Sequence, residues 1–364
     1  MKKGLKIIGI IVLLILIAMI ALPIVFKGKI VDQIKTTANK SLNATLEFED
    51  VSLSLFSNFP DLTVEIEKLD LSNHTPFEGV HLVKANNVSA TVNLWSVFGE
   101  TIEINEISLS EPNIDVRVLV DGSANYDIAK ASEGPNEEEE SSENEDDSAF
   151  AIALKNYSIE NGNISYSDAT FPMEFKMQDF QHSGSGDFTS SVFDLQTLTE
   201  VNELTFSYDN VSYINKAKTS IDAGFNIDTD QSKYTFKENN ILLNNFALNA
   251  DGYVSMPGED IDMDIQFAAL NNDFKSIMSL IPAEFAQDLD GVNASGEVSF
   301  DGFLKGKYNS FSLPGLVMNL KIEDGMMQYP DLPESLKNVQ IDAHLDANKG
   351  IDNDELKLDL NTFH

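Results

Sequence analysis

Apolar residues recur at alternate positions in many short segments of this chain of 364 residues. Successive side chains of a β-strand point to opposite faces, so apolar residues with polar ones between them predict antiparallel strands with one face in water. Dipeptides typical of turns also occur along the chain, at Asp121-Gly122, Asn161-Gly162, Asp251-Gly252 and Asp301-Gly302. The sequence therefore predicts a mainly β fold. The clearest alternating segments are 62–67, 88–94, 114–120, 221–227, 261–267 and 339–345.

One internal segment departs from this pattern. Residues 274–289 read FKSIMSLIPAEFAQDL and place apolar side chains near helical spacing, with Asp290-Gly291 closing the segment. Pro282 is expected to kink the helix or split it in two, because proline lacks the N–H that a helix needs. We therefore expect one or two short helices within the β fold.

The amino-terminal segment 7–26 contains twenty residues without a charge. A helix of that length spans about 30 Å, the thickness of the hydrocarbon core of a bilayer. A cleaved signal peptide would have a shorter apolar run ending in a small-x-small site, and a buried soluble helix would rarely be apolar on every face. We predict an uncleaved transmembrane anchor whose candidate membrane residues are Ile7, Ile11, Leu14, Ile17, Leu22 and Phe26.

The charges on either side of this segment nearly balance, so they do not decide its orientation. Long domains translocate largely regardless of their charge, which favours residues 1–6 in the cytoplasm and the body outside. After the anchor, apolar residues recur every four positions, which predicts that residues 27–44 form an amphipathic stalk helix. The residues of this stripe are Ile30, Ile34, Ala38 and Leu42.

The rest of the chain divides into four expected segments. Residues 45–130 form a first β region, and residues 131–149, with nine acidic and no basic side chains, form a disordered linker. A calcium loop is the alternative for this linker, but no spaced D-x-D-x-D-G pattern is present. The frame I-E-[ND]-G-x-[IM]-x-Y-x-D occurs from Ile159 and again 163 residues later, from Ile322.

We interpret each copy of this frame as a strand, a turn and a second strand, and the pair as an internal repeat. Residues 150–321 are then a first β module, and residues 322–364 are the truncated start of a second. The chain ends directly after an expected strand without a polar tail or cap. We therefore expect it to be the amino-terminal part of a longer protein.

Composition excludes several functions. The formal net charge is −35, which argues against nucleic acid as a partner, because such binding depends on Lys and Arg. Cysteine is absent, which removes disulfides, thiolate metal ligands and thiol nucleophiles. None of the five histidines has a metal-site spacing such as H-E-x-x-H. We predict no catalytic residue, no metal, no cofactor and no enzymatic activity.

Several segments resemble a known family. At 102–128, Glu111-Pro112 leads into Asp121-Gly122-Ser123-Ala124-Asn125-Tyr126-Asp127, and farther on Gly302 and Lys305-Gly306 precede the frame at Ile322. Together with the anchor and VSLSLFSNFPDLTVEIEKLDLSN at 51–73, these residues resemble the AsmA family of Gram-negative envelope proteins. The resemblance extends over essentially the whole chain. The acidic segment 131–149 departs from it, because the family passes directly into the next strands there.

The resemblance implies a single-pass protein of the bacterial inner (plasma) membrane, with its carboxy-terminal body in the periplasm and a part in outer-membrane biogenesis. It implies a curved, repetitive antiparallel β-sheet that forms an apolar groove and transfers phospholipid between the inner and outer membranes. The implied partners are membrane lipids (phospholipid or lipopolysaccharide-related), the inner membrane itself and outer-membrane assembly proteins. The family offers no catalytic residue.

The alternating residues permit two structures. The same pattern describes a β-sandwich whose apolar faces pack together, and only the resemblance favours an open groove. In a groove, acyl chains would gain about 0.8 kcal/mol for each buried methylene. The alternative function is a periplasmic scaffold or regulator of outer-membrane protein assembly and targeting to the membrane, without lipid transport. The candidate groove-lining residues are Val64, Ile66, Val116, Val118, Ile261, Met263, Ile265 and Phe267.

Overall fold

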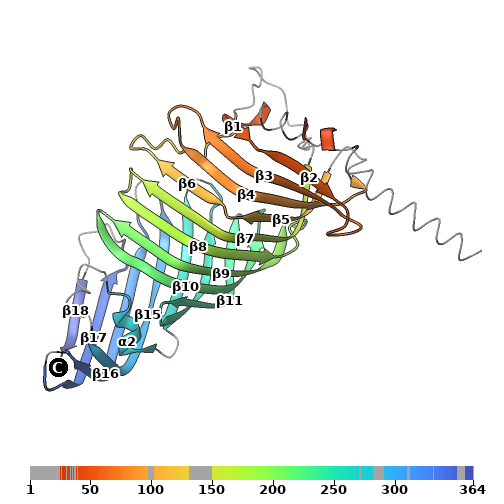
Figure 1. The fold of residues 1–364 in the computed structure, drawn as a ribbon. Helices are drawn as coiled ribbons and strands as arrows, with labels where there is room; N and C mark the ends of the chain where they lie inside the picture. Colours follow the sequence, from red (N-terminus) through yellow and green to blue (C-terminus); the bar gives the residue numbers. More distant parts are fainter. Residues whose placement is uncertain are drawn as a thin grey trace, which may run out of the picture. The chain divides into compact units, whose positions relative to one another are not determined.

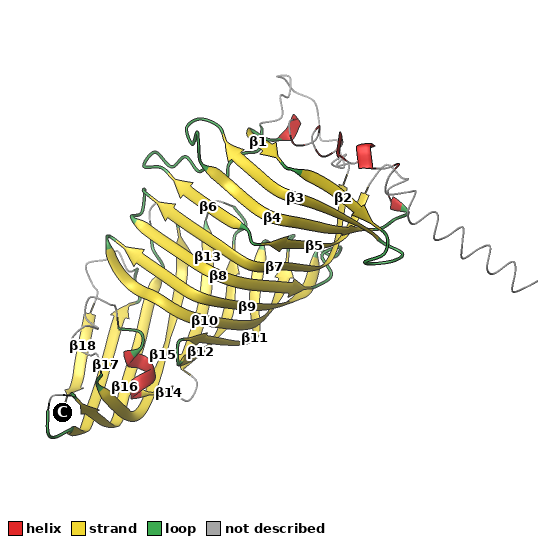
Figure 2. Ribbon diagram, in the orientation of Figure 1, coloured by secondary structure: helices red, strands yellow, loops and turns green. Residues whose placement is uncertain are grey.

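The chain divides into two compact units, Met1–Phe171 and Pro172–His364, and we describe each by itself. Both are built mainly from β-strands, as the computed structural model shows (Figures 1 and 2). The structure describes residues 25, 27–29, 31, 32, 34, 36, 38, 40–96, 102–130, 150–258, 260–269, 272–281, 291–309, 312–330, 332–350 and 357–363.

The first unit is a mixed β-sheet. Strand β3 pairs with β1, β2 and β4, and β4 pairs with β5 and β6, in each case antiparallel. Strands β5 and β6 each pair with β7 in parallel, which corrects the expectation of a wholly antiparallel sheet. The strands are β1 (Ala44–Glu47), β2 (Asp50–Ser54), β3 (Leu62–Asn73), β4 (His81–Val92), β5 (Ile102–Ser110), β6 (Asn113–Val118) and β7 (Phe150–Asp168).

The parallel pairing has a physical reason in the sequence. Parallel neighbours need a crossover connection of a dozen or more residues, whereas antiparallel neighbours can be joined by two. The connection between β6 and β7 contains the acidic segment 131–149 and supplies that length. The segment itself lies outside the described residues.

A small apolar core lies at one end of the first unit. It consists of five buried side chains, Val51, Leu55, Leu62, Val64 and Val92, against which the partly buried Val31 packs. Val31 belongs to the helical residues described between 25 and 41, which precede β1. Lys27 from the same stretch forms an ion pair with Asp50, with 2.7 Å between Nζ and Oδ1. The residues that follow the expected anchor are thus attached to the sheet.

The second unit is an antiparallel meander, in which neighbours in sequence pair with one another (Figure 1). The short β14 pairs with β15, as does β13, and the order then continues to β18. The elements are β8 (Met173–Ser185), β9 (Val192–Tyr208), β10 (Val211–Asp228), β11 (Lys233–Leu243), β12 (Phe246–Ser255), β13 (Ile261–Ala269), β14 (Asn272–Asp273), α2 (Phe274–Met278), β15 (Asn293–Tyr308), β16 (Gly315–Gln328), β17 (Leu336–Ala347) and β18 (Lys357–Phe363).

Three of the four expected turn dipeptides lie inside strands, so that expectation was wrong for them. Only Asp121-Gly122 lies in a turn, whereas the other three are internal to β7, β12 and β15. The frame that begins at Ile159 and Ile322 is likewise no hairpin, because β7 and β16 run through it as continuous strands.

The positive-φ residues of these frames bend the strands instead of reversing them. Asn161 and Asp324 have φ angles of 52° and 51°, and the register of β16 against β17 shifts at the second position. An extra residue of this kind makes a β-bulge, which increases the local twist and curvature of a sheet. The expected module boundary between residues 321 and 322 falls inside β16.

The predicted helix near 274–289 is present in its first part. Helix α2 covers Phe274–Met278 and continues into a turn that reaches Ile281. Pro282 and the remainder up to residue 290 lie outside the described residues.

The membrane anchor remains a prediction. No helix in the part of the chain that the structure describes is long and apolar enough to cross a membrane. The candidate anchor residues Ile7, Ile11, Leu14, Ile17, Leu22 and Phe26 all lie outside that part.

Candidate functional site

One face of the second unit is apolar from β12 to β18. Residues directly opposite one another in antiparallel strands point to the same side of the sheet, so the register defines rows of side chains across it. One row passes through Phe267, Gly302, Met318, Leu345 and Leu358. We call this side of the sheet the apolar face; it includes Phe246, Leu248, Ala250, Gly252, Val254, Ile261, Met263, Ile265, Phe267, Ala269, Val298, Phe300, Gly302, Leu304, Gly306, Leu316, Met318, Leu320, Ile322, Ile341, Ala343, Leu345, Ala347, Leu358 and Leu360.

The opposite face of the same strands is mostly polar. Lys305 forms an ion pair with Asp264, with 2.6 Å between Nζ and Oδ2, and this contact raises the pKa of the Lys305 ammonium. Farther along the sheet, the Asn319 amide donates a hydrogen bond of 2.8 Å to Asp301, and a ring nitrogen of His344 lies 2.7 Å from the Asn319 oxygen. The acidic residues of this unit can therefore remain in water while the apolar face carries none.

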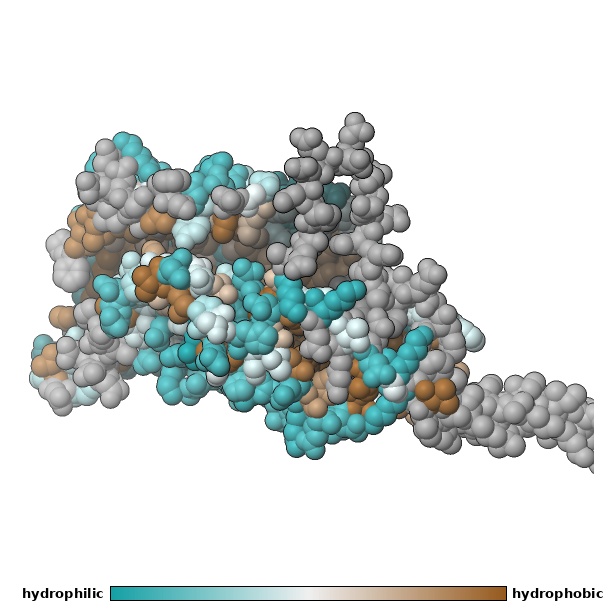
Figure 3. Space-filling model, turned by 90° about the horizontal axis from the view of Figure 1, so that it is seen from above, coloured by the Kyte–Doolittle hydropathy of each residue, from teal (hydrophilic) through white to brown (hydrophobic). Residues whose placement is uncertain are grey.

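Most of the apolar face is half-buried and not covered. Among the described residues of this unit, one cluster of buried apolar residues lies on it, made by Phe274 of α2 with Ala294 and Ile322. Most other side chains of the face keep intermediate exposure, and Leu358 and Leu360 on β18 are exposed. A sandwich would bury this face beneath a second sheet. In Figure 3, apolar residues lie mainly in the recessed part of the surface and hydrophilic ones cover most of the raised part.

Three aromatic rings pack against one another in series on the apolar face. Phe300 lies between Phe246 and Phe267, with ring centroids 5.7 Å and 5.6 Å away. Gly302 is directly opposite Phe267, and a Cβ atom at Gly302 would collide with this ring and with the Val317 carbonyl. The glycine thus makes room for the phenylalanine, and the family-like Gly302 motif has a packing role.

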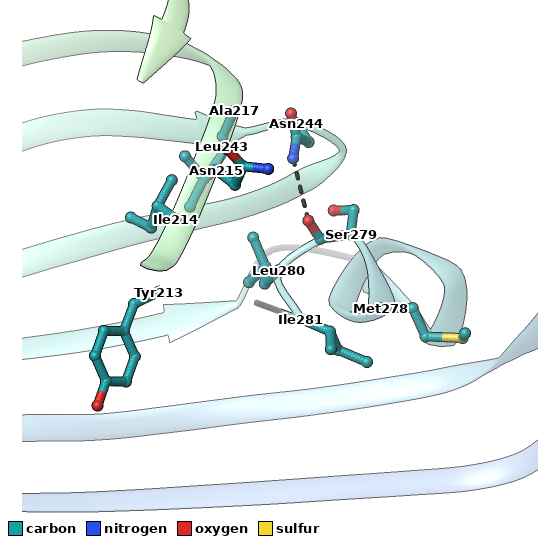
Figure 4. Close-up of a pocket in the computed structure, with 10 residues that line it drawn as sticks. All are labelled: Tyr213, Ile214, Asn215, Ala217, Leu243, Asn244, Met278, Ser279, Leu280 and Ile281. Carbon is teal, nitrogen blue, oxygen red and sulfur yellow. Dashed lines mark hydrogen bonds between the residues drawn. The ribbon is translucent and has the colours of Figure 1, made fainter. Parts of the chain in front are cut away.

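A pocket of about 270 Å³ lies where α2 meets the sheet (Figure 4). Asn244, in the turn between β11 and β12, links strand β10 to the residue that follows helix α2. Its side-chain oxygen accepts a hydrogen bond of 2.9 Å from the Lys218 N–H, and its amide donates one of 3.2 Å to the Ser279 carbonyl. The pocket is mainly apolar, and its lining residues are Tyr213, Ile214, Asn215, Ala217, Leu243, Asn244, Met278, Ser279, Leu280 and Ile281.

Asp273 caps the amino-terminal end of helix α2, and we expect the stability that this cap contributes to depend on pH. Asp273 Oδ1 accepts hydrogen bonds of 2.7 Å from both the hydroxyl and the backbone N–H of Ser276, and these hold the pKa of the Asp273 carboxyl below its usual range. We expect Asp273→Ala to lower the free energy of unfolding by about 1 kcal/mol. Because the folded pKa is lowered, this contribution is complete above the ordinary aspartate pKa and is lost as the pH falls through the lowered one.

Urea unfolding at neutral and at acid pH measures this effect. Asp273→Asn is the control, because asparagine caps helices as well as aspartate does but does not titrate. Equal stability of Asp273→Ala and the unchanged protein at neutral pH would contradict the role of the cap.

The predicted groove residues fall into two separate groups. Ile261, Met263, Ile265 and Phe267 are all half-buried on β13, and all four point to the apolar face. The other four belong to the first unit: Val64 and Ile66 contribute to its core cluster, Val118 is buried and Val116 is half-buried on β6.

The sequence reasoning missed the part of the apolar face that lies on β16. Leu316, Met318, Leu320 and Ile322 alternate there as clearly as the residues of β13 do. The pattern could have been found in the sequence, but the turn assigned at Asp324-Gly325 divided this strand from its continuation.

The family-like motif at 111–127 is structural. Asn125 is 1% exposed, and its side chain accepts a hydrogen bond of 2.8 Å from the Arg117 N–H and donates one of 2.7 Å to the Asp115 carbonyl. Pro112 is fully buried between β5 and β6, where its carbonyl accepts the Asn163 N–H of β7 at 2.7 Å. These residues fix the loop after β6 and the junction of two strands with β7.

We expect Asn125→Ala to lower the free energy of unfolding by about 3 kcal/mol. The change leaves the part-buried Arg117 N–H and Asp115 carbonyl without these hydrogen bonds, each loss costing roughly 1–3 kcal/mol. Urea unfolding measures the loss. Tyr126→Ala, at the neighbouring exposed side chain, is the matched control and is expected to change stability by less than about 0.5 kcal/mol. Equal values for the two variants would show that Asn125 has no such role.

In the part of the chain that the structure describes, no group of three or more His, Asp or Glu residues is arranged to hold a metal ion. Asp70 and Ser72 both contact the same ring nitrogen of His81, at 2.7 Å and 2.9 Å. A nucleophile relay needs the two partners on opposite nitrogens of the ring, so this cluster lacks that geometry.

The fold and the site define a class of protein: a mainly β protein in which one unit presents a polar face on one side of its sheet and a half-exposed apolar face on the other. The model of the AsmA family matches residues 1–279, and the chain belongs to this family. Membership supports an envelope-associated protein that takes part in outer-membrane biogenesis. No curated protein and no solved structure was found to match the chain.

Proposed function

We propose that the chain binds the acyl chains of phospholipids on the apolar face and passes the lipids between the inner and outer membranes. The observation that carries the proposal is the continuity of this face: from β13 to β18 every position in the row of Phe267 and Met318 is apolar or glycine. Residues 7–26 serve as the inner-membrane anchor, and the body lies in the periplasm.

The chemistry of the face suits a lipid tail. Each methylene that leaves water for an apolar surface contributes about 0.8 kcal/mol to the binding free energy. The side chains of the face are half-exposed, so an acyl chain can cover their remaining apolar surface. No charged side chain interrupts the rows, so an acyl chain can move from strand to strand without passing a buried charge. A headgroup at the edge of the sheet remains in water, as its polarity requires.

Aromatic side chains mark one stretch of this path. Phe267 and Phe300 are half-buried and stack on each other beside Gly302, where no side chain stands on the sheet, and the fully buried Phe246 packs against Phe300. Flat aromatic surfaces bind acyl chains by contact alone, without a directional bond. Transfer along the face therefore needs no catalytic group.

The alternative is a scaffold that contacts outer-membrane assembly proteins and carries no lipid. A photoreactive amino acid placed at Met263 or at Phe267 distinguishes the two, with Gln266 as the matched control. Gln266 lies on the same strand but is exposed on the opposite face. We expect phospholipid adducts in cells at Met263 and Phe267 and none at Gln266. Protein adducts alone at Met263 and Phe267 would favour the scaffold and contradict lipid binding.

A further inference from the structure

Three large aromatic side chains of the first unit are exposed on neighbouring loops. Phe56 and Phe59, in the loop between β2 and β3, are 59% and 58% exposed, and Trp95, just after β4, is 75% exposed. The first residue of β3 is directly opposite the last residue of β4 (Leu62 and Val92), so both loops lie at the same end of the sheet.

Hydrogen bonds attach the first of these loops to the neighbouring strands. The Asn58 amide, between the two phenylalanines, donates to the hydroxyls of Thr63 on β3 and Thr91 on β4, at 3.1 Å each. The Asn105 amide of β5 donates to Asp61, at the end of the first loop, at 3.2 Å. The aromatic side chains are therefore carried by a structured end of the sheet.

Packing fixes which side chains point outward. Leu55 is fully buried in the core cluster of the first unit, and Leu94 packs against the same cluster. The residue that follows each of them, Phe56 and Trp95, is exposed. Each loop thus packs one leucine against the core cluster, fully buried for Leu55 and partly buried for Leu94, and exposes the aromatic side chain that follows it.

The charge of this end differs from that of the chain as a whole. The protein has a formal net charge of −35, yet residues 54–60 and 91–96 contain no charged residue, and Asp61 at the end of the first loop accepts a hydrogen bond from Asn105. Exposed aromatic side chains are typical of the membrane–water interface, where a tryptophan ring lies among lipid with its N–H hydrated and phenylalanine adds apolar surface. An acidic surface would be repelled from the same place when the lipids are anionic.

The chain itself brings this end of the sheet close to the expected anchor. Val31 packs against the cluster that contains Leu55, and Lys27 is paired with Asp50. Val25, which is exposed and helical, is the one described residue of the uncharged segment 7–26 and lies near its carboxy-terminal end. From Val25 to Val31 a helix advances only about 9 Å.

We propose that Phe56, Phe59 and Trp95 form a docking tip that inserts into the interfacial region of the bilayer. The occupant is the lipid surface itself, beside the point where the anchor enters it. The tip holds the first unit against the membrane, in addition to the tether that the anchor supplies. A second copy of the chain or another protein covering the tip is an outcome that the test separates from this one.

The test uses the only tryptophan of the chain. The full chain is reconstituted into phosphatidylcholine vesicles whose acyl chains are brominated close to the headgroup, and the fluorescence of Trp95 is recorded. Bromine quenches a tryptophan only when the two are nearly in contact. We expect the brominated vesicles to lower the Trp95 emission at least twofold relative to unbrominated ones, and aqueous acrylamide to quench it weakly.

A matched control places the fluorophore at the other end of the same sheet. Tyr126 is 57% exposed and follows Asn125, whose carbonyl accepts a hydrogen bond of 2.6 Å from the Asn73 side chain at the far end of β3. Twelve residues of strand separate the two ends, about 36 Å. In Tyr126→Trp combined with Trp95→Phe, we expect acrylamide to quench the emission and brominated lipid to leave it unchanged.

A second variant tests the cooperation of the two loops. Phe56→Ser with Phe59→Ser keeps Trp95, and both changed side chains are more than half exposed, so the fold is expected to persist. We expect quenching by brominated lipid to fall at least threefold. Free access of acrylamide to Trp95 in the unchanged protein would overturn the proposal, and so would shielding from both quenchers, which would indicate a protein contact.

Discussion

We expect Ile265→Asp to reduce the phospholipid bound by the full chain at least tenfold. Ile265 is half-buried on β13, where it is directly opposite Gly252 on one side and Leu304 on the other, within the apolar face. An aspartate there keeps contact with water when no lipid is bound, so the fold is expected to tolerate it. An acyl chain that covers the carboxylate would remove that water, and burying a charge without a partner costs several kcal/mol. Each 1.4 kcal/mol corresponds to a factor of ten in affinity.

Native mass spectrometry of the full chain in a mild detergent counts the bound lipid. Gln266→Asp is the matched control, because it adds the same charge to the next residue of the strand, on the opposite and exposed face. Lipid held at the anchor is common to both variants. If Ile265→Asp binds as much phospholipid as Gln266→Asp, the apolar face is not the lipid site.

The largest effect on stability is expected for Gly252→Ala. Gly252 lies inside β12 with a φ of +116°, which side-chain-bearing residues rarely adopt, and an added Cβ would meet the backbone carbonyl of Asp264 on β13. The strand has to move or the pairing of β12 with β13 has to open. We expect a loss of about 3 kcal/mol or more in the free energy of unfolding, because strain of this kind costs about 1–3 kcal/mol and the collision adds to it.

Urea unfolding measures this loss as well. Gly258→Ala is the control, because no atom lies within 4 Å of a Cβ at Gly258 and its φ is not positive. We expect that variant to change stability by less than about 0.5 kcal/mol. A Gly252→Ala protein as stable as the control would show that β12 does not need the conformation described here.

The alternation of apolar residues predicted the strands well, and its limits have a physical reason. An Asn-Gly or Asp-Gly pair favours positive φ, and both a hairpin turn and a β-bulge use that conformation. Whether the chain reverses at Asn161 or Asp324 depends on the partners of the flanking residues. Here both β7 and β16 keep pairing beyond the bulge. The parallel pairing of β7 with β5 and β6 joins segments that are distant in the sequence, and the alternation of apolar residues does not predict it.

The candidate site was predicted in part for a similar reason. The alternation identified Ile261, Met263, Ile265 and Phe267 as residues of one strand face, and the register confirms that they share it. Whether a second layer covers such a face depends on the rest of the fold, because a sandwich and a single sheet have the same pattern along one strand. The exposure of Phe56 and Trp95 is equally a property of the packing, since each follows a leucine that is drawn into the core cluster.

A photocrosslinking scan along one row of the apolar face tests the lipid path most directly. The photoreactive residue is placed in turn at Phe267, Met318 and Leu345, which lie in one row on β13, β16 and β17, and at Asn319 and His344 on the opposite face as controls. We expect phospholipid adducts at all three positions of the row and none at the two controls. Adducts at none of the three, or as many at the controls as in the row, would contradict a continuous lipid path on this face.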